Sequence, residues 1–294
     1  MTLPTNRSIA MRASLLSIFG NALMAVIKAF VGIVGNSFAL VADAVESATD
    51  VFSSTLVFLG LRYSTKPADE DHPYGHGRME ALVTFLVVGF LVASATWIAV
   101  EAVHNIQRPH EMPKPFTLYF LLLVVGGKEI FYRVIKKKGK QTGSSALQAD
   151  AWHHRSDAIT SAVAFIGISI ALILGEGYES ADDYAALFAS AFISFNAYKI
   201  FRPALGEIMD EHQYPEMEQK IRALALDVSG VQGTEKCRIR KTGMSYFVDL
   251  HLEVDGQMTV NKGHDISHEV KDILRNELPE IADVLIHIEP FHSK

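Results

Sequence analysis

Two copies of one pattern place acidic side chains inside otherwise apolar sequence. The copies run from Ala42 to Asp50 and from Ala149 to Asp157. Each contains an acid, a metal-competent residue three positions on, and a second acid four positions after that. On a helix these positions share one face. Two such helices facing each other would gather four candidate ligands, namely Glu46, Asp50, His153 and Asp157.

Carboxylates at membrane depth predict a metal site. An ionisable side chain inside a bilayer costs several kcal/mol, so it is a functional hypothesis by default. The purely structural alternative is a buried polar network that only holds the helices together. Interhelical hydrogen bonds average under ~1 kcal/mol, which is too little to offset the burial of three acids. Three carboxylate oxygens and one imidazole suit a tetrahedral divalent ion. Zinc is the first choice, and iron, cadmium and manganese remain open.

The first acid of each copy, Asp43 and Asp150, lies one turn before the quartet. Either residue could be a relay acid in the ion pathway or a partner of the ligands. The alternative is that both line a water-filled cavity without a defined role. Periodicity does not decide between these possibilities.

The composition predicts an α-helical membrane protein. Mean hydropathy is +0.18, and long stretches contain no charge. The single cysteine, Cys237, excludes a disulfide framework and a thiolate cluster. The net charge of −6 argues against nucleic acid as a partner. No His-Glu-x-x-His occurs, and no nucleophile has an evident base, so we do not expect an enzyme.

We expect a transmembrane domain over residues 1–206 and a soluble domain over residues 207–294. Each expected span reaches the ~20 residues that a helix needs to cross a bilayer. The six expected spans are 9–34, 37–63, 79–105, 115–137, 144–175 and 182–204. The third is the clearest, because it has no charge from Ala81 to Val100.

The distribution of Lys and Arg predicts the orientation. The most basic stretch, 134–140, lies between spans four and five, whereas the loop Gly175–Asp183 has no Lys or Arg. The positive-inside rule therefore predicts that both termini and the 2–3 and 4–5 loops are cytoplasmic. We expect a multi-pass protein of the cell membrane.

The last 88 residues predict a small α+β domain. Helical periodicity covers 216–228 and 264–278. Strand-like alternation covers 236–240 and 245–254 around Thr242-Gly243, which is a hairpin signal, and a last strand covers 283–289. The order αββαβ predicts helices on one side of a sheet.

These features together resemble the cation diffusion facilitators, in particular dimeric bacterial exporters of zinc and iron. The resemblance covers nearly the whole chain. It depends on the two acidic copies, on the string from Asp69 to Gly77 with His-Pro-Tyr-Gly-His-Gly, and on the αββαβ tail. It implies a homodimer that exchanges cytoplasmic divalent metal for protons. Metal ions are then cargo or regulators, and no prosthetic group is expected.

The resemblance also implies two metal sites outside the membrane. In the 2–3 loop, matching positions form a site at Asp69, His72 and His76. In the tail, matching positions bind a metal pair at the dimer interface, and here they are His251, His264, His287 and Glu289. Glu235 stands where relatives carry another histidine. Arg78 and Asp210 match an ion pair near the membrane surface.

One other function remains open. A membrane-anchored sensor could bind metal in its tail and signal without transport. Acids on two separate spans argue against it, because a sensor needs no ligands at membrane depth.

Overall fold

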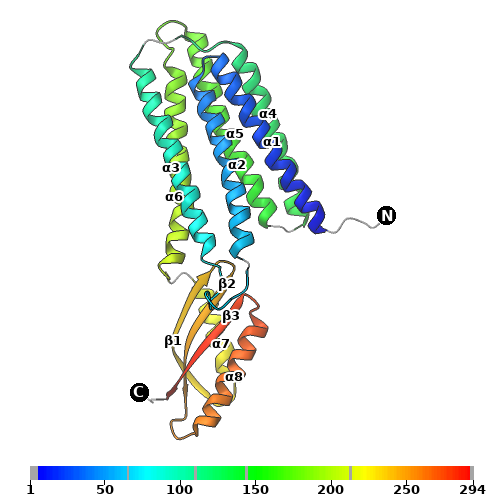
Figure 1. Cartoon of the computed structure of the whole chain (residues 1–294), viewed down its shortest axis with the longest axis vertical. Coiled ribbons are helices and arrows are strands. Elements are labelled where there is room, and N and C mark those ends of the chain that lie inside the picture. The colour runs from blue at the N-terminus through cyan, green and yellow to red at the C-terminus, as the bar shows by residue number, and fades with distance from the viewer. Residues whose placement is uncertain (1–5, 65, 109–110, 143–144, 212–213, 292–294) are drawn as a thin grey trace, which may run out of the picture. The chain divides into compact units, whose positions relative to one another are not determined.

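The computed structural model of the chain describes residues 6–64, 66–108, 111–142, 145–211 and 214–291 (Figure 1). Six long helices precede an αββαβ segment, which confirms the predicted fold class. The helices of the first part are α1 (Asn6–Val34), α2 (Phe38–Ser64), α3 (Met79–Ile106), α4 (Phe116–Thr142), α5 (Ser145–Leu174) and α6 (Ala181–Ile208). The tail contains α7 (Pro215–Leu226), β1 (Val231–Thr242), β2 (Ser245–Val254), α8 (Val260–Glu277) and β3 (Ile281–Pro290).

The chain forms two compact units. One contains residues 1–57 and 86–200, and the other contains 58–85 and 201–294. The helices α2, α3 and α6 each contribute to both units. The predicted domain boundary at residue 207 therefore falls within α6.

The helices of the first unit carry apolar side chains on their outside. On α1, Val26, Phe30 and Ile33 are each about two-thirds exposed or more. Their spacing of four and three residues places them on one helical face. Among the described helices, α3 is the one long and apolar enough to cross a membrane, and α1 and α5 contain the shorter apolar stretches 21–34 and 158–174. An outward stripe of large apolar residues suits lipid contact.

The tail packs two helices against one face of a three-stranded sheet. The strand order is β1-β2-β3, with β1 and β2 antiparallel and β2 and β3 parallel. Alternate residues of β2, from Val248 to Val254, are buried, because successive strand residues point to opposite faces. On α8, Ile266, Val270 and Leu274 recur every four residues and complete the core. The other face of the sheet carries polar residues such as Asp249 and His251, together with the exposed Leu285.

Two boundaries in the tail differ from the sequence prediction. The first strand begins at Val231 rather than at residue 236, and its pairing with β2 is irregular near Gly233 and again between Thr234 and Cys237. These bulges interrupt the alternation on which the prediction depended. The second helix begins at Val260 rather than 264, because the Thr259 hydroxyl accepts a hydrogen bond from Lys262 N and caps it.

The predicted hairpin turn at Thr242-Gly243 is present. Gly243 has a φ of 63°, in the left-handed region that glycine adopts most easily. Its amide donates to Glu207 Oε1 at 2.9 Å, and Lys241 Nζ lies 3.5 Å from the other oxygen of that carboxylate. The hairpin is therefore held to the carboxyl end of α6 within the second unit.

The buried face of β2 should determine the stability of the tail. Replacing Leu250, which is fully buried, by Ala should destabilise the tail by about 2–5 kcal/mol, because a cavity adds to the lost apolar burial. The matched control is Leu285→Ala on the neighbouring strand, where the side chain is 68% exposed and the expected change is within about 0.5 kcal/mol. Amide hydrogen exchange of the peptides from β1 to β3 in the full-length chain measures both. Equal protection in the two variants would contradict this account of the core.

Candidate metal sites

The two membrane copies of the acidic pattern lie on α2 and α5. Glu46 is buried and Asp50 is half-buried on α2. The backbones of His153 and Asp157 belong to α5, and their side chains, like that of Asp150, lie outside the described residues. The structure therefore describes only the α2 half of the expected quartet.

A hydrogen bond sets the register between these two helices. The Ser161 hydroxyl on α5 lies 3.0 and 2.9 Å from the two carboxylate oxygens of Asp43 on α2. The helices are antiparallel. The amide of Ala39, at the start of α2, donates to Asp182 at the start of α6, and α6 begins shortly after α5 ends. Figure 1 shows α2 and α5 side by side.

The antiparallel register aligns the two patterned stretches. From Asp43, one turn forward along α2 leads to Glu46 and two turns lead to Asp50. From Ser161, one turn backward along α5 leads to the backbone of residue 157, and two turns lead to residue 153. Each step covers about 5 Å in the same direction. Glu46 therefore lies near the height of the backbone of residue 157, and Asp50 near that of residue 153.

Sequence reasoning missed a buried cation beside the acids. Lys28 on α1 has no exposed surface, and its ammonium lies 2.8 Å from Asp43 Oδ2 and donates to Ser47 Oγ at 2.9 Å. The signal was available, because Lys28 is the sole charged residue between Arg12 and Asp43. The sequence left open whether Asp43 is a relay acid, a partner of the ligands or a residue without a defined role, and the structure makes it an ion-pair partner of α1 and a hydrogen-bond partner of α5.

The loop between α2 and α3 gathers Asp69, His72 and His76. One ligand-type atom from each lies within 4.8 Å of the others. Asp69 Oδ1 accepts from the amide of His72 at 2.7 Å and lies 2.9 Å from its Nδ1, while Oδ2 lies 3.4 Å from His76 Nε2. Gly75, with a φ of 78°, turns the chain so that the two imidazoles approach without a helix.

The donor set of this loop suits a divalent metal ion. The hydrogen bond from His72 lowers the pKa of the Asp69 carboxyl below its ordinary value, so the carboxylate is charged at neutral pH. His76 is buried, and its Nδ1 has no hydrogen-bond partner among the described residues. One carboxylate and two imidazoles are ligands that zinc and similar ions accept.

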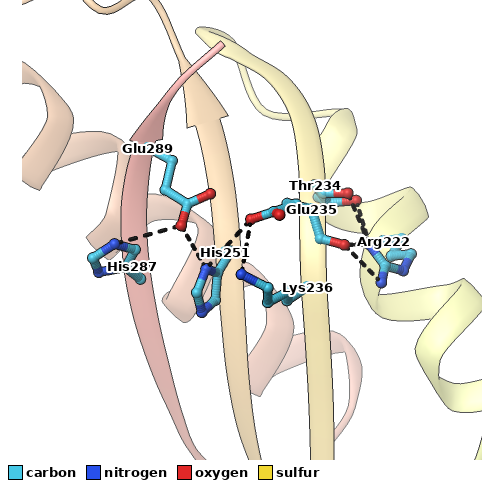
Figure 2. A network of polar contacts seen from close by, with 7 residues as sticks. All are labelled: Arg222, Thr234, Glu235, Lys236, His251, His287 and Glu289. Atoms are coloured by element: carbon cyan, nitrogen blue, oxygen red, sulfur yellow. Dashed lines mark hydrogen bonds and ion pairs between the residues drawn. The ribbon is translucent and has the colours of Figure 1, made fainter. Parts of the chain in front are cut away.

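The tail carries a second group on the open face of its sheet (Figure 2). His251 on β2 is directly opposite His287 on β3 in the parallel register, and Glu289 follows two residues along β3. His251 Nδ1 lies 2.7 Å from Glu289 Oε1, and His287 Nε2 lies 3.6 Å from the same oxygen. The three residues form one ligand cluster within 4.8 Å.

The surroundings of this cluster are polar and partly exposed. Glu235 on β1 lies 3.9 Å from His251 Nδ1, and Lys236 lies 3.3 Å from Glu235. As Figure 2 shows, Arg222 on α7 fixes the backbone beside them by donating to the Thr234 carbonyl at 2.9 Å. The bulge in β1 directs Glu235 to the same region as the two imidazoles.

His264 lies apart from the other three predicted tail residues. It is exposed on α8, where its ring contacts that of His268 at 4.4 Å between centroids. Among the described residues, the cluster on the sheet does not include it. The helix packs on the opposite face of the sheet from the cluster, so one chain does not bring all four residues together.

The expected ion pair between Arg78 and Asp210 is present within the second unit. Arg78 Nη2 lies 3.7 Å from Asp210 Oδ1, with both side chains about half exposed. An exposed pair of this kind contributes at most about 1 kcal/mol.

Nearly the whole chain is similar to proteins of one family. The family model described as the cation efflux transmembrane domain matches residues 14–209, and that of the cation efflux protein cytoplasmic domain matches residues 214–291. The manganese efflux system protein MneP of Bacillus subtilis is 32% identical over 290 residues, covering 97% of this chain and 98% of MneP. Metal tolerance protein C1 of Arabidopsis thaliana is 31% identical and covers 91% of this chain and 59% of that protein. A solved MamM C-terminal domain is 24% identical with a TM-score of 0.26, covering 27% of this chain and all of that domain.

The tail cluster generates a prediction about charge. The hydrogen bond from His251 lowers the pKa of the Glu289 carboxyl below that of an ordinary glutamate. The bond therefore stabilises the folded tail fully at pH values above the ordinary glutamate pKa. This stabilisation is lost as the pH falls through the lowered pKa of Glu289. In His251→Ala the pKa of Glu289 should return toward its ordinary value. Carbon-13 NMR titration of labelled glutamate in metal-free protein measures this. His264→Ala is the matched control and should leave the titration unchanged, and an unchanged titration in His251→Ala would contradict the assigned cause.

Proposed function

The chain belongs to the cation efflux family, the cation diffusion facilitators, and is a transporter of divalent metal cations rather than an enzyme; we propose that it exports a transition metal from the cytoplasm in exchange for protons. The observation that carries the proposal is the register of α2 and α5 fixed by Asp43 and Ser161. It supports a shared site made by Glu46, Asp50, His153 and Asp157. We further propose that the protein lies in the cell membrane with both termini in the cytoplasm.

Exchange follows from the chemistry of the proposed ligands. Carboxylates and imidazole bind metal only when deprotonated, so metal and protons compete for the same side chains. Metal that arrives from the cytoplasm displaces protons from the quartet. Once the helices open the site to the other side, protons that enter there displace the metal. Ligands on two different helices allow such a site to form and loosen as the helices move.

The two clusters outside the bilayer have other proposed roles. Asp69, His72 and His76 form a loop site that takes metal close to the end of α2. The cluster of His251, His287 and Glu289 binds metal on the open face of the tail sheet, where a second copy of a cytoplasmic dimerisation domain can approach. We propose that this cluster stabilises the homodimer or senses metal, and that it does not conduct. His264 lies on α8, on the opposite side of the sheet, and is not part of this proposed cluster within one chain.

Two metals fit the quartet best. The imidazole of His153 favours zinc, which accepts nitrogen and oxygen together. The three carboxylates favour a harder ion, and the name of MneP gives manganese as the exported metal of that relative. Zinc remains our first choice from the ligand set, with manganese as the second candidate.

Flux into proteoliposomes tests the proposal against a sensor. Purified protein should drive zinc or manganese uptake that depends on an imposed proton gradient. Asp50→Ala should reduce this uptake to the background of empty vesicles, since it removes a ligand and a proton acceptor together. The control is Glu176→Ala, an exposed acid in the loop after α5, which should keep wild-type flux.

Each contrary outcome has a distinct meaning. Wild-type flux in Asp50→Ala would disprove the intramembrane site. Flux independent of the gradient would disprove antiport. Metal binding by the tail without any flux would support the sensor instead.

Ligand chemistry at the quartet should determine selectivity. Replacing His153 by Asp makes the shell all oxygen, and replacing Glu46 by His adds a nitrogen. We expect the manganese-to-zinc flux ratio to rise in the first variant and fall in the second, each by about tenfold or about 1.4 kcal/mol. His154→Asp, the same change one position along, is the control and should leave the ratio unaltered. Unchanged ratios in both quartet variants would place selectivity outside this ligand set.

A further inference from the structure

A lysine with no exposed surface lies beside the proposed transport site. The Lys28 ammonium on α1 contacts Asp43 Oδ2 at 2.8 Å and Ser47 Oγ at 2.9 Å, both on α2. The Ser47 hydroxyl in turn donates to the Asp43 carbonyl at 3.0 Å. Together with Ser161, these contacts bind three helices through one carboxylate.

A buried charge of this kind is too costly to be incidental. An ammonium away from water requires a partner and further hydrogen bonds, and loss of one member of a buried pair is far more harmful than loss of both. Two oxygens of Asp43 are already engaged by Lys28 and Ser161. Both oxygens of the carboxylate therefore have protein partners, whereas a transport ligand must alternate between metal and protons.

We infer that Lys28 is a positioning residue for the transport site: it neutralises Asp43, withholds that carboxylate from the metal, and sets the charge that an entering cation meets at Glu46 and Asp50. The inference depends on the proposed function, because it requires that the quartet carries the cargo. Asp43 is one helical turn, about 5 Å along the axis, from Glu46. A net charge left at that place acts on the cargo at short range and in a medium of low polarity.

The sign of this effect distinguishes it from a purely structural role. Asp43→Asn removes the anion and leaves the lysine, so an extra positive charge should repel the incoming metal. For a single positive charge and a divalent cation about 10 Å apart at an effective dielectric of about 20, the KM for metal should rise by roughly two orders of magnitude. Lys28→Met in the same chain removes the repelling charge, so the double variant Lys28→Met/Asp43→Asn should return the KM toward that of wild type. The single Lys28→Met variant should have a KM no higher than wild type.

The experiment measures initial rates of zinc uptake into proteoliposomes over a range of zinc concentrations. Wild type, the two single variants, the double variant and Lys114→Met are compared. Lys114 is an exposed lysine of the same unit whose ammonium donates to the Val34 carbonyl, and its replacement should alter neither KM nor maximal rate. If a single variant does not fold, the remaining single variant is compared with the double variant.

The outcomes separate the inference from the proposed function. Reversal of the KM change by the second substitution supports the charge role of Lys28. A double variant with a KM at least as high as that of Asp43→Asn overturns it, as does a loss of maximal rate in all three variants without any change in KM. Absence of zinc and manganese uptake by wild type would instead refute the proposed function itself.

Discussion

Charge inside an apolar helix bundle must be compensated, and that requirement organises the first unit of this protein. Lys28 and Asp43 meet at 2.8 Å with both side chains almost fully buried. The same carboxylate accepts a hydrogen bond from the Ser161 hydroxyl. A second acid, Asp182, accepts hydrogen bonds from the Ser37 hydroxyl and from the amide of Ala39. Each of these contacts joins segments far apart in the sequence. Because the polar partners have few alternatives in such surroundings, they fix the relative height of the helices.

In the second unit, one arrangement occurs twice on unrelated elements. A carboxylate lies between two imidazoles, with Asp69 between His72 and His76 in a loop, and Glu289 between His251 and His287 on a sheet. In each case a histidine hydrogen bond lowers the pKa of the carboxyl. The carboxylate is thus charged and oriented without metal, which reduces the rearrangement that binding requires.

The helices and strands could be predicted from the sequence better than the side-chain contacts between them. Charge-free runs and strand alternation gave the six helices and the αββαβ order, since both patterns follow directly from helical and strand geometry. Alternation failed at Gly233 and Glu235, where bulges shift the register of β1. His264 was grouped with His251 by resemblance, yet it lies on α8, and periodicity alone cannot say which elements meet. Lys28 was overlooked because a lone cation has meaning only once Asp43 is found beside it.

The helix α2 carries two kinds of acid within two turns. Asp43 has fixed partners from α1 and α5, so its charge is part of the framework. Glu46 and Asp50 follow it on the face that the sequence pattern assigns to metal. The proposed exchange of metal for protons would use both kinds, because ligands that bind metal and protons in turn change charge in every cycle, while the helices that hold them must keep their register. A break in the contact between Asp43 and Ser161 would loosen the register of α2 and α5. Lys28, which has no exposed surface and lies 2.8 Å from Asp43, gives this acid a buried cation as its partner within the same framework.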